Sequence, residues 1–260
     1  MKDFLYSDIP VVNKKAFRLG LSTSFGLDTK DIQTALEDKM NYIFWTPTMK
    51  KATPVLKDVL KKDREKYILA TGPTTAWWRN NIRKFTEKTL SSLKIDYLDI
   101  LQIHWLGVTS SWNEGISEEL ERLREEGKTK AIGISIHNRE RAGLLAQESS
   151  LDSFMIRYNA AHPGAEREIF PYIDKERHNV TSYTATRWRK LLKRPKGWDG
   201  KVPTAGDCYR FCLTNDNVNV VLCGPKNKEQ YNENISAIEK GPLTEEEMKW
   251  MREFGKVVHG

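Results

Sequence analysis

The chain has 260 residues, of which 42 are Lys or Arg and 35 are Asp or Glu, so its formal net charge is +7. Eight Trp, nine Tyr and nine Phe are too many for a chain that cannot collapse, and the composition therefore excludes a disordered protein. No apolar run approaches the roughly 20 residues that span a bilayer, and the first residues lack the apolar core of a signal peptide. We expect a cytoplasmic protein with no membrane partner.

Short β-rich runs alternate with helical patterns from one end of the chain to the other. The predicted strands are 18–22, 41–45, 67–71, 97–105, 130–135, 153–159, 179–185 and 218–224. Many of these runs are apolar throughout, which is typical of parallel strands buried on both faces. Eight β-then-helix units over this length favour a closed (β/α)8 TIM barrel as a single domain spanning residues 1–260, with a doubly wound sheet as the alternative.

The helical segments between the strands show helical spacing of apolar residues. Helices are predicted over 28–39, over a segment that ends at Leu93, and over 113–127. In the last of these, Ile116, Leu120 and Leu123 share one face and Gly127 is placed to end the helix.

The three cysteines, Cys208, Cys212 and Cys223, are odd in number and do not form a disulfide framework, which fits a reducing compartment. Cys208 and Cys212 are four residues apart, but no second pair or nearby His completes a zinc set. We expect core thiols and no metal. The stretch 187–198 mixes basic and aromatic residues, but it is more typical of a solvated loop or a small-anion site, so no nucleic-acid partner is expected.

In a TIM barrel the active site lies at the carboxyl ends of the strands. Polar and aromatic residues gather at these predicted ends: His104, Trp105, His137, Arg157, Tyr158, His162, Tyr183 and Arg187. The HExxH, P-loop, GxSxG and GxGxxG spacings are absent, so the common hydrolase and Rossmann signatures do not apply.

Four segments stand out along the chain: DYLDILQIHW, EEGKTKAIGIS, RYNAAHPGAEREIFPY and VVLCGPKNKEQYNENISAI. In their order and spacing they resemble the aldo-keto reductases, a family of NADPH-dependent (β/α)8 barrels. DYLDILQIHW resembles the fourth strand of the family, which ends in an active-site His, here His104. EEGKTKAIGIS resembles the fifth strand and ends at Ser135, RYNAAHPGAEREIFPY resembles the segment after the sixth, and VVLCGPKNKEQYNENISAI resembles the cofactor-phosphate segment. The resemblance implies a TIM barrel and oxidoreductase activity on a small carbonyl compound.

The resemblance also implies a catalytic set of Asp, Tyr, Lys and His, of which this chain keeps only the His. In the family, the Tyr donates a proton to the carbonyl oxygen, and a Lys paired with the Asp lowers the pKa of that Tyr. Here the Asp position falls at Trp45, the Tyr position at Lys50 and the Lys position at Gly72. We interpret this chain as a member of a divergent subgroup with an altered catalytic tetrad, in which His104 and Lys50 are the catalytic candidates. Tyr183 is a further candidate proton donor.

The cofactor side of the resemblance implies an NADP(H) site. Ser135 matches the residue that hydrogen-bonds the nicotinamide carboxamide, Tyr183 the aromatic that stacks on the ring, and Lys226 the cation that meets the 2′-phosphate. The remaining cofactor candidates are Asn227, Gln230 and Asn234. The structural alternatives are a rim aromatic for Tyr183, a surface lysine for Lys226, and helix capping and solvation for the pair Glu233–Asn234.

If the altered catalytic set belongs to a substrate pocket with a new use, that pocket would need new polar groups. The substrate-binding candidates are Trp45, Trp105, Arg157, His162 and Arg187. Arg157 and Arg187 could hold a carboxylate or phosphate by bidentate hydrogen bonds, which makes an anionic substrate an expectation. The alternative for both is a salt bridge to Glu166, Glu168 or another rim carboxylate.

Three functions therefore stay open. The first is an NADP(H)-dependent oxidoreductase with a different proton donor, and the second is a non-reductase barrel that binds NADP(H) or another small ligand, such as a sensor. The third is an isomerase or lyase that acts on an anionic substrate. No oligomeric state follows from the sequence.

Overall fold

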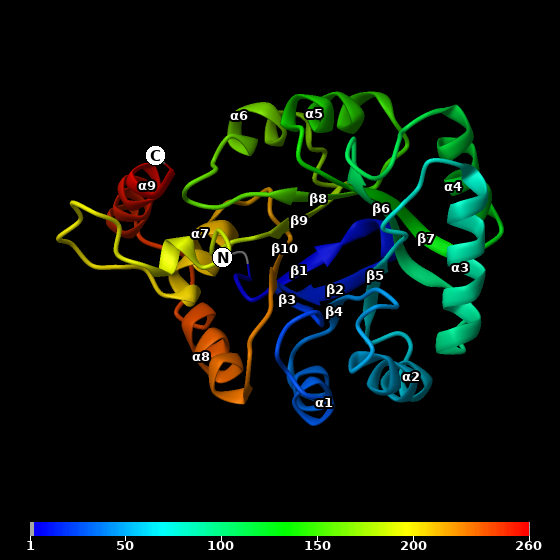
Figure 1. Ribbon diagram of the computed structural model, residues 1–260, viewed down its shortest axis with the longest axis horizontal. Helices are drawn as coiled ribbons and strands as arrows, with labels where there is room; N and C mark the ends of the chain where they lie inside the picture. Colours follow the sequence, from blue (N-terminus) through cyan, green and yellow to red (C-terminus); the bar gives the residue numbers. More distant parts are fainter. Residues whose placement is uncertain (1–2, 260) are drawn as a thin grey trace.

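Eight parallel strands close into a barrel in the computed structural model, which describes residues 3–259 (Figure 1). Around the barrel the strands follow the order β10-β3-β4-β5-β6-β7-β8-β9, and β10 pairs with both β9 and β3. Their bounds are β3 Leu19–Ser22, β4 Tyr42–Phe44, β5 Ile68–Thr71, β6 Leu98–Leu106, β7 Thr129–Ile136, β8 Ser153–Arg157, β9 Asn179–Tyr183 and β10 Val220–Cys223. The (β/α)8 TIM barrel expected from the sequence is confirmed.

Helices surround this barrel and connect its strands. Their bounds are α1 Thr29–Asp38, α2 Ala52–Lys62, α3 Arg79–Leu93, α4 Glu114–Glu125, α5 Arg139–Glu148, α6 Ala165–Glu168, α7 Ala205–Thr214, α8 Lys228–Ile238 and α9 Glu245–His259, with 3-10 turns η1 Pro10–Val12, η2 Phe170–Tyr172 and η3 Lys190–Leu192. The helix predicted over 113–127 forms as α4, capped by the Asn113 side chain and followed by Gly127 at a φ of +70°. The side chain of Asp28 caps α1 in the same way.

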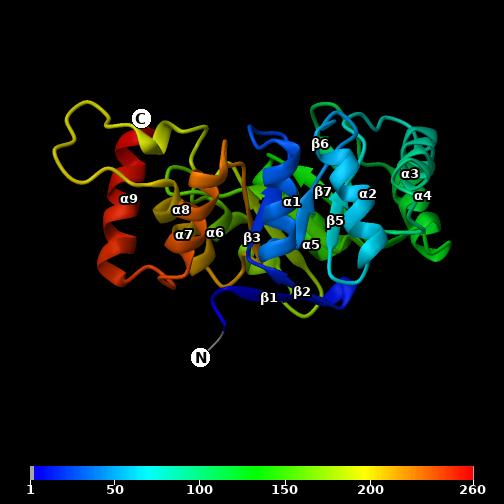
Figure 2. The ribbon, with the colours of Figure 1, turned by 90° about the horizontal axis from the view of Figure 1, so that it is seen from below.

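An antiparallel hairpin that precedes the barrel closes its amino end. It consists of β1 (Tyr6–Ile9) and β2 (Lys14–Phe17) and lies across that end in Figure 2. Ile9, Val12 and Ala16 pack into the interior of the barrel, so the hairpin region forms the floor of the inner core.

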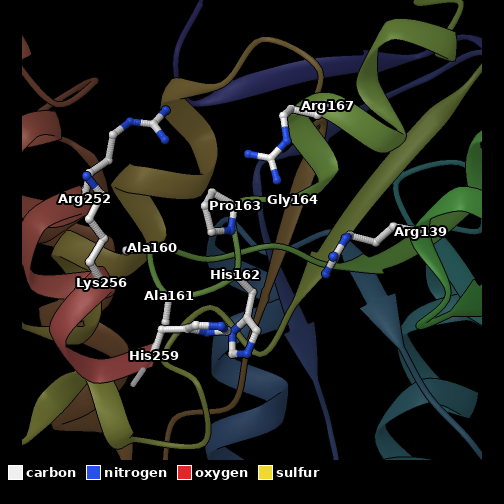
Figure 3. Close-up of a pocket in the computed structure, with 10 residues that line it drawn as sticks. All are labelled: Arg139, Ala160, Ala161, His162, Pro163, Gly164, Arg167, Arg252, Lys256 and His259. Carbon is white, nitrogen blue, oxygen red and sulfur yellow. The ribbon is translucent and has the colours of Figure 1, made fainter.

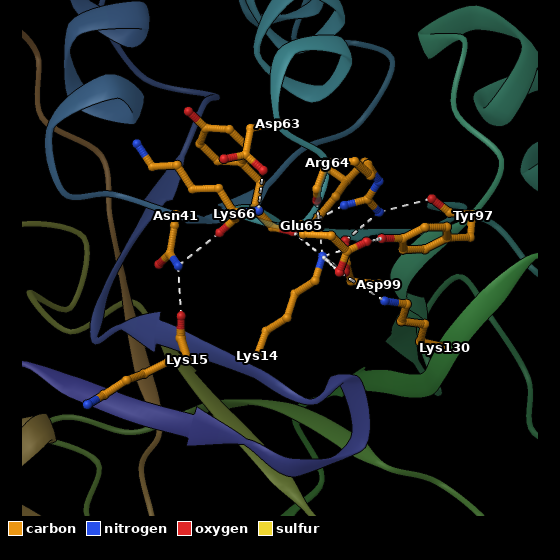
Figure 4. A network of polar contacts seen from close by, with 12 residues as sticks. Lys14, Lys15, Asn41, Asp63, Arg64, Glu65, Lys66, Tyr97, Asp99 and Lys130 are labelled. Carbon is orange, nitrogen blue, oxygen red and sulfur yellow. Dashed lines mark hydrogen bonds and ion pairs between the residues drawn. The ribbon is translucent and has the colours of Figure 1, made fainter.

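A buried ion network fastens this hairpin to the strands (Figure 4). Asp99 at the start of β6 is fully buried and accepts from Lys14 Nζ at 2.9 Å and Arg64 Nη2 at 2.6 Å. Asp99 Oδ2 also accepts from the backbone N–H of Leu69 at 2.9 Å. Burial lowers the pKa of Lys14, and Asp99 opposes that shift. This network belongs to the amino end of the barrel, where polar groups stabilise the fold and chemistry is not expected.

Successive residues of each strand face in turn the barrel axis and the surrounding helices. Tyr42, Ile68, Ala70, Ile100, Ala131, Met155, Val220 and Leu222 form the inner core. Their chain neighbours, among them Ile43, Leu69, Leu101 and Val221, belong to a larger core that includes helix residues. This alternation decides which residues at the carboxyl ends of the strands, here called the barrel mouth, point inward.

Candidate functional site

His104 lies at the barrel mouth near the end of β6 and is buried, with 4% of its surface exposed. The amide nitrogen of Gln102 lies 3.2 Å from His104 Nε2. The side-chain amide of Gln102 therefore contacts one ring nitrogen of His104, and a neutral ring carries a single N–H. Burial lowers the pKa of His104 to about 4, so the ring is neutral near pH 7.

The backbone beside His104 is irregular. The pairing of β6 with β7 shifts between Ile103 and Leu106, and Trp105 adopts a left-handed φ of +50°. This conformation is unfavourable for a bulky residue, and such strain gathers at functional sites. The indole of Trp105 is half exposed at the rim, where it is available to a ligand.

The two residues at the end of β4 point in opposite directions. Phe44 packs against the inner core and meets the His104 ring edge-on, with 5.3 Å between ring centroids. Trp45 is 1% exposed and packs in the outer core, and its indole N–H has no hydrogen-bond partner within residues 3–259. This placement argues against Trp45 as a substrate contact, because its side chain does not face the barrel axis.

Met49 and Lys50 follow β4 in the loop that leads to α2. Met49 Sδ lies 2.9 Å from Thr23 Oγ1 and 3.4 Å from the backbone N of Thr46. Lys50 is exposed, and its ammonium makes no ion pair or hydrogen bond to the rest of the described chain.

Gly72 follows β5 in a place that admits no side chain. A Cβ built on it would collide with the backbone oxygen of Gln102 on β6. The strand ends of β5 and β6 therefore approach each other here more closely than any residue other than glycine allows.

Tyr183, His137 and Arg157 form a polar group on the opposite side of the mouth from Phe44. The hydroxyl of Tyr183, at the end of β9, lies 2.8 Å from His137 Nδ1. Arg157 on β8 is paired in register with Tyr183, and its guanidinium makes no ion pair or hydrogen bond to other residues in the described range. Burial raises the pKa of Tyr183 to about 12, and Arg157 opposes this shift. Burial and Arg157 both lower the pKa of His137.

The predicted cofactor residues fall into two neighbouring places. Ser135 is buried on β7 and its hydroxyl makes no hydrogen bond to the other described residues. Lys226 is exposed after β10, the strand next to the one that carries Tyr183, and its ammonium has no ion-pair partner among residues 3–259. It precedes α8, an eleven-residue helix whose amino end favours anions.

The other three cofactor candidates take part in local structure at α8. Asn227 Oδ1 accepts from the backbone N of Gln230, and Gln230 Oε1 accepts from the backbone N of Lys226, both at 3.0 Å. Asn234 is buried on α8. Asn234 thus lies inside the helix and does not cap it, and Asn227 is the residue that caps α8. Ser135, Tyr183 and Lys226 keep groups that can meet a dinucleotide.

The remaining substrate candidates do not join the mouth directly. Arg187 donates to the backbone oxygens of Val258 and His259, the latter at 3.3 Å, and so caps the carboxyl end of α9. Within residues 3–259 it pairs with no carboxylate. His162 Nδ1 lies 3.1 Å from Asn159 Oδ1, and the His162 ring meets the His259 ring edge-on. Sequence reasoning missed His137 as a partner of Tyr183, although its place after β7 is visible in the sequence.

The cysteines and the other potential metal ligands do not form a metal centre in the described part of the chain. Cys208, Cys212 and Cys223 are buried free thiols, as the sequence indicates. No group of three or more His, Cys, Asp or Glu within residues 3–259 is arranged to hold a metal ion. In the same range, no helix combines the length and apolarity that crossing a membrane requires.

Comparison with known proteins adds to this geometry. Residues 41–194 match the family model described as "Aldo/keto reductase family". The chain is 23% identical to the Uncharacterized oxidoreductase YqkF of Bacillus subtilis, over 96% of this chain and 94% of that protein. Among solved structures, the holo form of aldo-keto reductase AKR11C1 from Bacillus halodurans superposes with a TM-score of 0.80 at 21% identity, covering 96% of this chain and 95% of that chain. The glycerol dehydrogenase AKR11B4 from Gluconobacter oxydans superposes with a TM-score of 0.78 at 20% identity, covering 100% and 98%.

Proposed function

The chain belongs to the aldo/keto reductase family, and on this basis we propose that it is an NADP(H)-dependent oxidoreductase that acts on a small carbonyl compound at the barrel mouth. The observation that carries the proposal is the convergence of His104, Ser135, Tyr183 and Arg157 at adjacent strand ends. Ser135 on β7 and Arg157 on β8 belong to paired strands, and Tyr183 follows on β9.

The residues present fit a nicotinamide dinucleotide. Ser135 offers a hydroxyl without a partner in the described chain, Tyr183 offers a half-buried ring face, and Lys226 offers an exposed cation before a helix amino end. When bound, the reduced cofactor would supply a hydride to the carbonyl carbon. Ser135 would hold the carboxamide, the Tyr183 ring would cover the nicotinamide, and Lys226 would meet the 2′-phosphate.

His104 would orient the carbonyl group. Its ring is neutral and Gln102 lies at Nε2, so the proposal assigns the single N–H to Nδ1, from which it would donate to a carbonyl oxygen. A ring with a pKa of about 4 carries almost no proton to give up near pH 7, so His104 is a hydrogen-bond donor and not the general acid.

The proton for the carbonyl oxygen would come from the Tyr183 hydroxyl. His137 Nδ1 lies within hydrogen-bond distance of that hydroxyl and can return a solvent proton to it, and Arg157 favours the phenolate that forms. The ring face and the hydroxyl edge of Tyr183 are separate surfaces, so covering a cofactor and delivering a proton use different parts of the residue. Lys50, the other donor candidate, has an exposed side chain without a polar partner in the described range.

A second function, binding of NADP(H) or another small ligand without turnover, is favoured by one observation. Phe44 and Gly72 leave no acidic or cationic side chain beside His104 on β4 and β5. With Tyr183 held near a pKa of 12, proton delivery would be slow, and a sensor would not need it.

The proposal is tested by measuring turnover of a set of small aldehydes and ketones. The loss of NADPH absorbance reports the reaction rate. Tyr183→Phe keeps the ring but removes the hydroxyl, so we expect kcat to fall by about 10²–10⁴-fold with NADPH affinity nearly unchanged. Lys50→Met is the matched variant and should leave kcat unaltered. Loss of turnover in Lys50→Met, with Tyr183→Phe active, would reverse the assignment. NADPH binding without turnover of any carbonyl would favour the second function.

A further inference from the structure

A pocket of about 340 Å³ lies beside the barrel mouth, between the loop that follows β8 and the last helix, α9 (Figure 3). All of its titratable lining side chains are basic. We call it the basic pocket, and these side chains are Arg139, His162, Arg167, Arg252, Lys256 and His259. Its volume is within the range of small-molecule sites, roughly 300–1,000 Å³.

The wall formed by α9 is held in a fixed position. Arg252, Lys256 and His259 are spaced by four and three residues, so they share one face of the helix, and in Figure 3 that face borders the pocket. Gly255 on the same helix packs against the backbone oxygen of Ala160, and a Cβ there would collide with it. Arg187 caps the carboxyl end of α9. The cations on α9 therefore face the loop that carries His162.

The positive charge of the basic pocket is only partly neutralised. Arg252 Nη2 lies 2.8 Å from Glu166 Oε1, and Arg139 Nε lies 2.7 Å from Glu168 Oε2. Neither carboxylate lines the pocket.

Two cations are left without a close partner. Arg167 has a side chain that is 80% exposed and only a 4.0 Å contact to Glu168 Oε1. Lys256 has no ion pair to any other residue of the described range. Four cations thus stand against two carboxylates, and the surplus faces the pocket.

His162 lies between these cations and the mouth. Burial lowers its pKa to about 4, and Arg157, Arg187, His259 and Arg139 add to the shift in that order. A half-buried imidazole surrounded by cations in this way marks a region of strong positive potential, which an anion would relieve.

We propose that the basic pocket binds the dianionic phosphate group of a small molecule. A tetrahedral dianion presents oxygens in several directions, and this pocket supplies cationic donors from α5, α6 and α9. Charge-assisted hydrogen bonds from Arg and Lys are the strong contacts that phosphate recognition uses.

The basic pocket also adjoins the reaction site. Asn159 connects the two: its Oδ1 lies 3.1 Å from His162 Nδ1, and its Nδ2 donates at 2.9 Å to the backbone oxygen of Thr184, the residue after Tyr183. The assignment of the phosphate to the substrate rests on the proposed reductase function. If that function holds, the natural substrates are phosphorylated carbonyl compounds. The binding site itself does not depend on that function.

Calorimetric titration of the full chain with inorganic phosphate and with glycerol 1-phosphate tests the proposal, with glycerol as the uncharged probe. We expect saturable binding of both anions and none of glycerol. The double variant Arg167→Gln/Lys256→Gln removes the two cations that lack a close partner. It breaks only the 4.0 Å contact of Arg167 to Glu168, which keeps its pair with Arg139, and should weaken phosphate binding about tenfold or more. Lys175→Gln, an exposed lysine before the start of β9, is the matched control and should bind as the unaltered protein does.

The outcomes distinguish free phosphate from a phosphate ester as the ligand. They also distinguish failure of the basic pocket from failure of the proposed reductase function. Binding of inorganic phosphate but not of the ester keeps the site and identifies the free anion as its ligand. Absence of saturable binding of either anion overturns the site, as does binding that survives the double variant. NADPH affinity should be the same in the double variant and in Lys175→Gln. Displacement of NADPH by phosphate would assign the binding to the Lys226 region and overturn the basic pocket.

Discussion

The backbone oxygen of Gln102 occupies the space in which a side chain at Gly72 would have to begin. Gly72 is the position at which the family resemblance would place a lysine, so this contact closes that position to any side chain. A side chain at this position would require the ends of β5 and β6 to lie farther apart than they do.

Replacing Gly72 by Ala should therefore destabilise the fold. The clash is with backbone of a central strand, which cannot move as a flexible side chain would, so we expect a loss of about 3 kcal/mol in the free energy of unfolding, the upper end of overpacking effects. Denaturant unfolding measures it. Gly115→Ala in the first turn of α4 is the matched control, because only ordinary contact surrounds its Cβ, and it should be neutral or stabilising. Equal stability of the two variants would refute the close approach of β5 and β6.

The opposite orientations of Phe44 and Trp45 give a second test. Phe44→Leu should change the affinity of a ligand bound at the mouth, because Phe44 packs beside His104. Trp45→Phe should lower the free energy of unfolding by about 1–3 kcal/mol and leave ligand affinity unaltered, because Trp45 packs in the outer core. The comparison requires both ligand titration and denaturant unfolding of each variant. If Trp45→Phe changed ligand affinity and Phe44→Leu did not, Trp45 and not Phe44 would face the barrel axis.

His104 should make stability fall as the pH is lowered below neutrality. Its pKa is about 4 in the folded protein against an ordinary value of 6.5, so the unfolded chain binds a proton that the folded protein excludes. The contribution is fully present above pH 6.5 and is lost as the pH falls, by about 2 kcal/mol down to pH 5. His137, His162 and His178 shift in the same direction and add to the slope.

Unfolding of His104→Gln measured from pH 7.5 to pH 5 isolates this contribution. The slope of unfolding free energy against pH should be shallower than in the unaltered protein, whatever the absolute stability of the variant. An unchanged slope would mean that His104 is solvated or paired with an acid.

The barrel could be predicted from the sequence because its signals are local. The strands are short apolar runs followed by helical patterns, some with their own cap, as at Asn113 and Asp28, and these patterns do not depend on distant residues. His104 was placed correctly at the end of its strand for the same reason.

The parts of the site that depend on orientation or on distant partners could not be predicted. Phe44 and Trp45 are both large and aromatic, so composition alone does not tell which one faces the axis. The partners of Arg187 are backbone oxygens about 70 residues away, and nothing near Arg187 in the sequence indicates them. The basic pocket likewise needs α9 to lie against Ala160, a contact that a pattern read along the chain does not reveal.

The most direct test of the central claim is a calorimetric titration of the protein with NADPH and NADP⁺, repeated with Lys226→Ala. Lys240→Ala, an exposed lysine at the far end of α8, removes the same charge elsewhere and is the control. The proposed function predicts saturable binding that weakens about tenfold or more in Lys226→Ala and stays unchanged in Lys240→Ala. No binding of either nucleotide to the unaltered protein, or equal binding to both variants, would contradict it.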